Sequence, residues 1–219
     1  ARARALVIQP PVLLLDEPLS NLDAKLREEM QFELRKIQRK VGTTTIMVTH
    51  DQSEAMSISD RVVVMESGRA TQIDPPHRLY EYPSNRFISN FVGKANLVSG
   101  QVSATGSQGQ VQVGALSFDV PDVDLPKGAE VLLSVRPEKV QLLAAGQGRL
   151  EGRVSERFFL GSQWLYTVAT DIGDMMVLAP NDGRPASVEG QTLGLDWPAH
   201  CMRVLPNLQG KTGIPASEA

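Results

Sequence analysis

Three polar side chains follow apolar runs at points where an α/β enzyme holds its reactive groups. Asp16 and Glu17 come directly after the apolar residues 12–15, and His50 follows the β-branched run 43–49. Ligands of open α/β sheets bind beyond the carboxyl ends of the strands. There an aspartate can hold Mg²⁺ against nucleotide phosphates, a glutamate can orient or deprotonate an attacking water, and an imidazole can hydrogen-bond a terminal phosphate. A turn at Asp-Glu-Pro and a structural histidine are the plainer interpretations, and the pattern leaves both open.

The elements that must position these side chains alternate between strand and helix in residues 1–92. Residues 12–15, bounded by prolines, are typical of a buried parallel strand. A long amphipathic helix is expected next, with Asp23 as its N-cap and Gly42 at its end. Its apolar stripe consists of Leu22, Leu26, Met30, Leu34, Ile37 and Val41. Its many charges favour a solvated helix face, and Glu28, Glu29 and Glu33 precede Arg35, Lys36, Arg39 and Lys40 in the order that suits the helix dipole.

A second strand and helix follow the first pair. The run 43–49 is typical of another buried strand, and Asp51 with Glu54 has the spacing of a capping box that opens a helix through Ile58. The remaining elements expected in this part are strands over 61–65 and 69–73 joined at Ser67 and Gly68, and two short helices broken by Pro83. Alternating strands and helices indicate an α/β fold with a parallel sheet.

The pattern changes after Gly93, where helical periodicity ends. Short strand candidates then recur between turn residues, at 110–113, 130–135, 152–156, 164–169, 175–178, 192–195 and 202–204. Several short strands at such spacing are typical of a small barrel or sandwich. We therefore expect three regions: the α/β part over 1–92, an all-β domain over 93–208 and a disordered tail over 209–219.

Composition and charge narrow the class of protein. The chain has 219 residues, 42% hydrophobic and 21% charged, which is ordinary for a globular protein of one or two domains. Its single cysteine, Cys201, excludes an internal disulfide and fits a reducing compartment. Residues 1–92 carry 12 basic and 12 acidic side chains, whereas residues 93–219 carry 10 and 13. An acidic β domain argues against a nucleic-acid partner, because such binding rests on basic patches.

The order of the motifs in residues 1–92 resembles the C-terminal half of an ATP-binding-cassette (ABC) ATPase. The segments "LLLDEP", "SNLD", "THD" and "DRVVVMESG" succeed one another in the order of that family. The resemblance implies that Asp16 is associated with Mg²⁺, that Glu17 is the catalytic glutamate and that His50 senses the γ-phosphate. It also implies a loop that contacts the opposite subunit, formed by Ser20, Asn21, Leu22 and Asp23. The residues expected to bind nucleotide are Asp16, Ser20, Asn21 and Asp23.

The β part resembles the regulatory TOBE domain appended to one group of bacterial importer ATPases. The segments that carry this resemblance are "SVRPEKV" and "ERFFLGSQWLYTV". In that group, which imports sugars, polyamines, ferric iron, sulfate or phosphonates, the appended domain is an OB-like β-barrel that binds small ligands or regulatory partners. The resemblance implies that Arg136, Glu138 and Ser162 contact a regulatory ligand. A turn with a surface ion pair is the alternative for the first two.

Two motifs of the ABC family are absent from the sequence. The phosphate-binding pattern Gly-x-x-x-x-Gly-Lys-Ser/Thr has a candidate at Gly210, Lys211 and Thr212, but Leu205 holds the first glycine position. The signature Leu-Ser-Gly-Gly-Gln is missing as well. The chain also begins without methionine, in a run over residues 1–8 that is typical of a helix already under way. We therefore expect a fragment of a longer ATPase that is inactive alone.

The function expected from these resemblances is that of an ATPase subunit that energises solute import, with ATP and Mg²⁺ as cofactors. The expected partners are a second copy in a homodimer, transmembrane permease subunits and, indirectly, an external binding protein. These partners would place it at the cytoplasmic face of the membrane. The alternatives are a non-transport ABC ATPase and a ligand-sensing regulatory module. The segment over residues 87–100 resembles polyamine, iron or phosphonate importers more than sugar importers.

Overall fold

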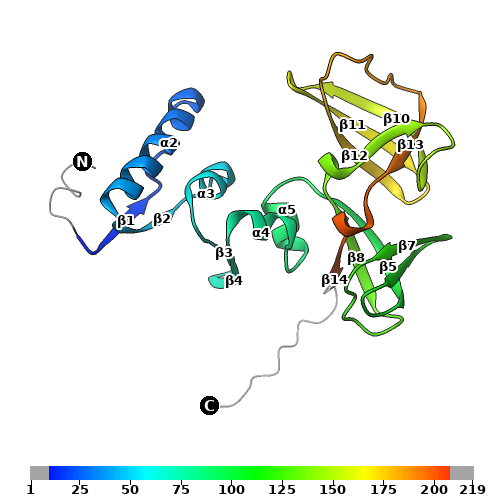
Figure 1. Cartoon of the computed structure of the whole chain (residues 1–219), viewed down its shortest axis with the longest axis horizontal. Helices are drawn as coiled ribbons and strands as arrows, with labels where there is room; N and C mark the ends of the chain where they lie inside the picture. Colours follow the sequence, from blue (N-terminus) through cyan, green and yellow to red (C-terminus); the bar gives the residue numbers. More distant parts are fainter. Residues whose placement is uncertain (1–9, 208–219) are drawn as a thin grey trace. The chain divides into compact units, whose positions relative to one another are not determined.

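The computed structural model describes residues 10–207 of the chain (Figure 1). The helix expected over residues 1–8 and the tail expected over 209–219 lie outside the described residues. Within the described part, no helix combines the length and the apolar character that crossing a membrane requires. The chain divides into two compact units between Glu81 and Tyr82, earlier in the sequence than the boundary expected after residue 92.

The first unit contains a two-stranded parallel sheet. β1 (Val12–Asp16) pairs with β2 (Thr44–Val48), and Asp16 stands opposite Val48 in the register. Helix α2 (Ala24–Val41) connects the two strands along the chain. A parallel pair connected through a helix is the arrangement that the alternating pattern predicts. Because the strands run in the same direction, the residues that follow them lie at the same edge of the sheet.

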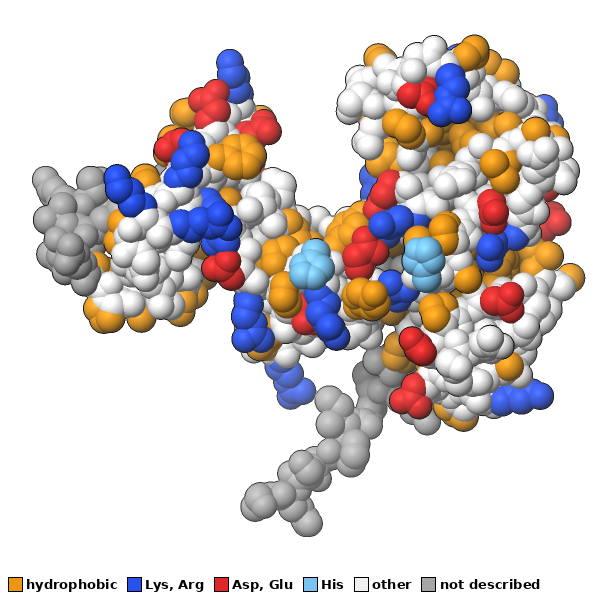
Figure 2. All heavy atoms as spheres, viewed as in Figure 1, with side chains coloured by type: hydrophobic (Ala, Val, Ile, Leu, Met, Phe, Trp, Pro, Cys, Tyr) orange, Lys and Arg blue, Asp and Glu red, His pale blue; other side chains and the backbone are white. Residues whose placement is uncertain are grey.

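The two strands are more exposed than the sequence predicts. Half-buried and exposed residues alternate along each strand, and neither contains a buried residue. Leu14 is 72% exposed and Val48 is 58% exposed, and hydrophobic side chains are visible at the surface in Figure 2. Within the described residues, the prediction that these two strands are buried is therefore wrong. The reason is that these strands pair only with each other there, so their alternate apolar side chains have no covering layer.

The helices of the first unit begin where their predicted caps stand. Asp23 has an extended backbone, and its carboxylate accepts a hydrogen bond from a backbone N–H in the first turn of α2. At the other end Gly42 adopts a left-handed φ of 72° and donates its N–H to the last turn. Helix α3 (Gln52–Ile58) likewise begins directly after Asp51. Both predicted helix boundaries are confirmed.

A hairpin and a short helix complete the first unit. β3 (Val62–Glu66) and β4 (Arg69–Asp74) pair antiparallel. They are joined at Ser67 and Gly68, which both have positive φ, 49° and 77°, as a two-residue hairpin turn matched to the strand twist requires. Helix α4 (Pro76–Glu81) follows. The predicted pair of strands and the first of the two short helices are confirmed.

The second unit consists mainly of two five-stranded antiparallel sheets (Figure 1). Their orders are β14-β8-β5-β6-β7 and β12-β11-β10-β13-β9. The strands are β5 (Asn96–Ala104), β6 (Gly109–Val113), β7 (Leu116–Val120), β8 (Glu130–Val135), β9 (Gln141–Ala144), β10 (Leu150–Phe159), β11 (Gln163–Thr170), β12 (Gly173–Pro180), β13 (Thr192–Asp196) and β14 (Arg203–Pro206). The helical segments are α5 (Arg86–Phe91) and the 3-10 turns η1 (Pro137–Lys139) and η2 (Ala199–Cys201). The all-β prediction is confirmed, and β5, β7 and β9 are strands that the pattern did not predict.

One hydrophobic core is shared by the two sheets of this unit. Buried side chains that contribute to it from both sheets include Val111, Phe118, Leu133, Val135, Val168, Val177 and Leu195. Trp197 is 2% exposed, and its ring stacks on that of Phe118 with the centroids 5.9 Å apart. Each fully buried side chain of this size contributes about 1.5–3 kcal/mol from removal of apolar surface from water. The second unit therefore has its own stable core.

Candidate functional site

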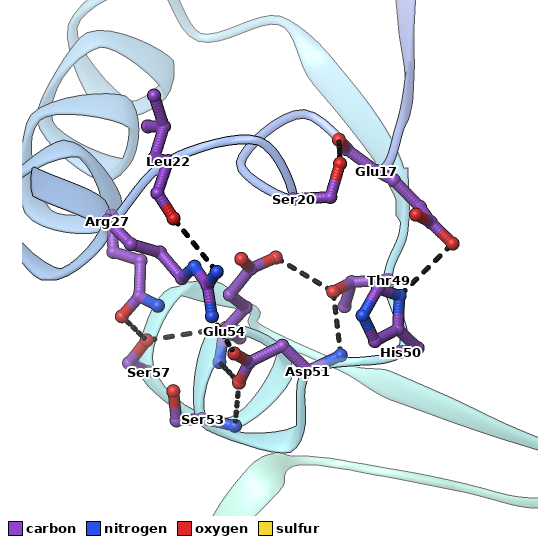
Figure 3. Close-up of polar contacts among 11 residues, drawn as sticks. Glu17, Ser20, Leu22, Arg27, Thr49, His50, Asp51, Ser53, Glu54 and Ser57 are labelled. Atoms are coloured by element: carbon purple, nitrogen blue, oxygen red, sulfur yellow. Dashed lines mark hydrogen bonds and ion pairs between the residues drawn. The ribbon is translucent and has the colours of Figure 1, made fainter. Parts of the chain in front are cut away.

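Glu17 and His50 lie together at the carboxyl edge of the parallel sheet. Nδ1 of His50 is 3.1 Å from Oε1 of Glu17 (Figure 3). Glu17 follows β1 directly, and its backbone N–H donates to the carbonyl oxygen of Val48 at 2.9 Å. This bond continues the strand pairing beyond the ends of the strands and brings the two side chains together. Both remain open to solvent, with 46% of Glu17 and 73% of His50 exposed.

The backbone of Glu17 adopts an unfavourable conformation. Its φ is 39°, a left-handed value that non-glycine residues rarely adopt. Backbone conformations of this kind cost on the order of 1–3 kcal/mol and persist where the surrounding structure enforces them, often at functional sites. Here the bond from Glu17 to Val48 and the packing of the fully buried Leu19 hold the turn in place.

Asp16 is the candidate metal ligand. It ends β1 and its side chain is exposed. Among residues 10–207, no three or more His, Cys, Asp or Glu side chains are grouped so that they could hold a metal ion. Mg²⁺ usually keeps several waters and is bound through one or two carboxylates together with substrate phosphates. Asp16 with Glu17 beside it therefore suits an ion shared with a nucleotide rather than one held by this unit alone.

The loop between β1 and α2 contains the other candidate nucleotide-binding residues. Leu19 is fully buried and anchors the loop. Ser20 donates its hydroxyl to the carbonyl oxygen of Glu17 at 3.0 Å. Asn21 is exposed, whereas the carboxylate of Asp23 is used to cap α2. Among these loop residues, Asn21 is thus the best placed to contact a partner through its side chain.

A polar network holds the segment around His50. Thr49 donates its hydroxyl to Oε2 of Glu54 at 2.8 Å and accepts the backbone N–H of Asp51 at 3.0 Å. Glu54 is 2% exposed, and Oδ1 of Asp51 accepts the backbone N–H groups of Ser53 and Glu54. The predicted capping box is therefore only half formed, because Thr49 takes the place that Glu54 would have at the N–H of Asp51. His50 stands between two residues that are anchored on either side.

Arg27 extends this network and was not singled out from the sequence. Its Nη1 donates to Oδ2 of Asp51 at 3.2 Å. Burial raises the pKa of Asp51, but hydrogen bonds from Ser53, Glu54 and Arg27 outweigh it and hold that pKa below its ordinary value. The sequence carried one signal of this role. Arg27 lies in the first turn of α2, where a cation opposes the helix dipole.

The three candidate regulatory residues of the second unit differ in how far they are buried. Arg136 is 4% exposed and donates through Nη1 to the carbonyl oxygens of Ser89, Gly93 and Lys94, at 2.8, 3.4 and 3.1 Å. The guanidinium of Arg136 is therefore buried rather than at the surface, and it binds backbone that leads into β5. Glu138 in η1 and Ser162 in the β10–β11 turn are exposed.

In comparisons with known proteins, single matches extend over both units of the chain. Residues 133–205 match the family profile of the TOBE domain. The Fe(3+) ions import ATP-binding protein FbpC of Agrobacterium fabrum is 43% identical over 179 residues, which cover 81% of this chain and 50% of that protein. The chain is therefore similar to import ATP-binding proteins over most of its length, and it matches the TOBE domain over residues 133–205.

Further importer ATP-binding subunits show the same relationship. The spermidine/putrescine import ATP-binding protein PotA of Rubrobacter xylanophilus is 42% identical over 210 residues, covering 92% of this chain and 56% of that protein. Its counterpart from Acidothermus cellulolyticus is 44% identical over 213 residues, covering 91% and 55%. The chain thus spans about half the length of the curated relatives that it matches.

Proposed function

We propose that the chain supplies the hydrolytic edge and the TOBE domain of an ATPase subunit that couples ATP hydrolysis to solute import. The observation that carries the proposal is the approach of Glu17 and His50, 3.1 Å apart, beyond the ends of parallel strands. The relationship to importer ATP-binding subunits over more than four fifths of the chain supports it.

The proposed chemistry divides the roles among three side chains. Asp16 would hold Mg²⁺ together with the nucleotide phosphates, where the ion would supply positive charge to offset the charge that develops on them. Glu17 orients the attacking water and accepts its proton. His50 meets Glu17 through Nδ1 and presents its other ring nitrogen, Nε2, to a phosphate oxygen.

The proposed partners follow from the same assignment. The exposed Asn21 and the neighbouring Ser20 meet the nucleotide and a second copy of the subunit in a homodimer. The dimer docks on transmembrane permease subunits at the cytoplasmic face of the membrane, and an external binding protein delivers the solute. Two of the relatives are named for spermidine and putrescine import and one for Fe(3+) import, which favours a cationic solute. Glu138 and Ser162, both exposed, remain the proposed contacts of a regulatory ligand.

The decisive experiment uses an ATPase of the relatives' full length. A chimera would join this chain to the half of the Acidothermus cellulolyticus relative that it does not match. The chimera is expected to hydrolyse Mg²⁺-ATP, and Glu17→Gln is expected to lower kcat by about 10²–10⁴ because a positioned base is lost, while ATP stays bound. Glu33→Gln, which removes an exposed carboxylate of α2 paired with Lys36, is the matched control. Equal turnover of the Glu17→Gln and Glu33→Gln chimeras would refute the proposal.

A further inference from the structure

The side chain of Arg27 joins two loops that are far apart in the sequence. Its Nη2 donates to the carbonyl oxygen of Leu22 at 2.9 Å, in the loop that precedes α2. Its Nη1 donates to Oδ2 of Asp51 at 3.2 Å, in the segment that follows β2 (Figure 3). One guanidinium therefore spans the Ser20–Asp23 loop and the residue next to His50.

Both ends of this bridge are anchored. Asp51 is fixed to the start of α3 by the backbone N–H groups of Ser53 and Glu54, and to Thr49 through its own N–H. On the other side, the N–H of Leu22 donates to the carbonyl oxygen of the fully buried Leu19 at 3.1 Å. Because both Asp51 and Leu22 are anchored, a displacement of one of them must either move the other or break the hydrogen bonds of Arg27.

Helix stability does not account for this arrangement. A cation near the N-terminus of a helix opposes the dipole, and Nε of Arg27 is buried without a hydrogen-bond partner. The side chains of Arg27 and Asp51 are also 30% and 25% exposed, so solvent weakens the attraction between them. The planar fork of an arginine is, however, suited to hold two acceptors at once, which a lysine ammonium does less rigidly.

We propose that Arg27 is a positioning residue that couples the segment around His50 to the Ser20–Asp23 loop. The consequence for catalysis rests on the proposed function, in which His50 contacts the terminal phosphate and the loop meets the second subunit. Arg27 then makes the placement of that loop depend on the placement of the residues next to His50. The coupling itself belongs to the first unit and is measurable without nucleotide.

The first test measures amide hydrogen exchange in the 219-residue chain. Arg27→Lys keeps the charge but loses the two-point bridge, so exchange at the Leu22 amide is expected to accelerate about tenfold, the effect of losing one charged hydrogen bond. Arg35→Lys is the matched control, because Arg35 lies on the same helix and pairs with Asp60 through two hydrogen bonds outside this network. Equal exchange at Leu22 in the two variants would overturn the proposal.

A double-mutant cycle separates coupling from simple support of the loop. Asp51→Asn keeps a good N-cap but weakens the charged bond to Arg27. It is expected to accelerate exchange at Leu22 in the wild-type background and to add almost nothing in the Arg27→Lys background. Additive effects would mean that Arg27 supports the loop independently of Asp51, and the proposal would fail. Unchanged far-UV circular dichroism checks that each variant is folded.

The second test uses the chimeric ATPase. Arg27→Lys is expected to lower kcat about tenfold with little change in KM, since the loop that completes the site is placed less well, and Arg35→Lys is expected to match the wild type. If the chimera hydrolyses ATP and loses activity with Glu17→Gln, but Arg27→Lys equals Arg35→Lys, the proposal fails and the proposed function stands. If the unmodified chimera is inactive, the proposed function fails, and the exchange measurements still decide the coupling.

Discussion

Glu17 combines a candidate catalytic side chain with a costly backbone conformation. Its φ of 39° directs the chain into the loop that leads to α2, and its carboxylate meets His50 at 3.1 Å. The turn is held by a hydrogen bond to β2 and by a buried leucine rather than by a residue suited to positive φ. At the residue scale, chemistry and local stability therefore make opposite demands on this position.

If the backbone of Glu17 is strained, glycine and alanine variants at this position should reverse their usual order of stability. An alanine normally stabilises a protein relative to a glycine, by about 0.5–1 kcal/mol in regular structure. At a positive φ the order reverses, so Glu17→Gly is expected to be more stable than Glu17→Ala by about 1 kcal/mol. Denaturant unfolding followed by far-UV circular dichroism measures the difference. A more stable alanine variant would show that the turn is not strained.

Asp51 makes the stability of the first unit depend on pH. Its pKa is lower in the folded than in the unfolded chain, because the hydrogen bonds it accepts from Ser53, Glu54 and Arg27 outweigh its burial. Near pH 4 the unfolded chain therefore binds more protons, and the stabilisation present above the unfolded pKa of about 3.9 is lost as pH falls through the folded pKa. Asp51→Asn should flatten this dependence in unfolding measured between about pH 3 and pH 6. Parallel pH profiles of the two proteins would contradict the assignment.

At the scale of elements, Arg136 joins the segment before β5 to the end of β8. Its guanidinium binds three backbone carbonyl oxygens, and next to it the hydroxyls of Ser89 and Ser134 lie 3.0 Å apart. These contacts explain why α5 belongs to the second unit although the sequence pattern places it with the α/β part. One side chain thus binds three backbone carbonyls of α5 and of the segment that leads from it to β5.

Removing the Arg136 guanidinium should destabilise the second unit. Arg136→Met keeps much of the side-chain volume but removes the hydrogen bonds to the buried carbonyl of Ser89 and to the part-buried carbonyls of Gly93 and Lys94, at an expected cost of about 2–4 kcal/mol. Arg153→Met is the control, since Arg153 is exposed and donates through Nε to Gly190, and it should cost less than about 0.5 kcal/mol. Both tryptophans lie in this unit, so unfolding followed by tryptophan fluorescence reports on it specifically. Equal midpoints for the two variants would contradict the role.

At the scale of the whole molecule, the 219 residues contain the proposed hydrolytic edge without a phosphate-binding pattern. The candidate at Gly210, Lys211 and Thr212 lacks the first glycine, and backbone amides around such glycines normally hold the phosphates. We predict that the chain alone neither binds ATP tightly nor hydrolyses it. A phosphate-release assay and ATP titration of the chain test this. Mg²⁺-ATPase activity that Glu17→Gln abolishes would contradict the prediction.

The sequence by itself determined the local features of this protein. The caps at Asp23 and Gly42, the hairpin turn at Ser67 and Gly68 and the change to β structure after Gly93 depend on neighbouring residues, so the pattern was sufficient to predict them. Strand β5 escaped prediction because polar residues and a glycine interrupt its apolar alternation, and β9 because it has only four residues. Strand β7 alternates apolar and polar residues and was missed although its pattern is that of a strand.

Only the tertiary structure decided which side chains meet. Glu17 and His50 follow different strands, and their approach depends on the parallel register of β1 and β2. The bridge from Arg27 to Leu22 and Asp51, like the burial of Arg136, depends on backbone brought together from distant segments. A sequence pattern records the type and spacing of residues along the chain, whereas the partner of a long polar side chain is set by packing in three dimensions. The sequence therefore predicted Glu17 and His50 as two separate candidate residues. It did not predict the geometry of the pair or the polar network that supports it.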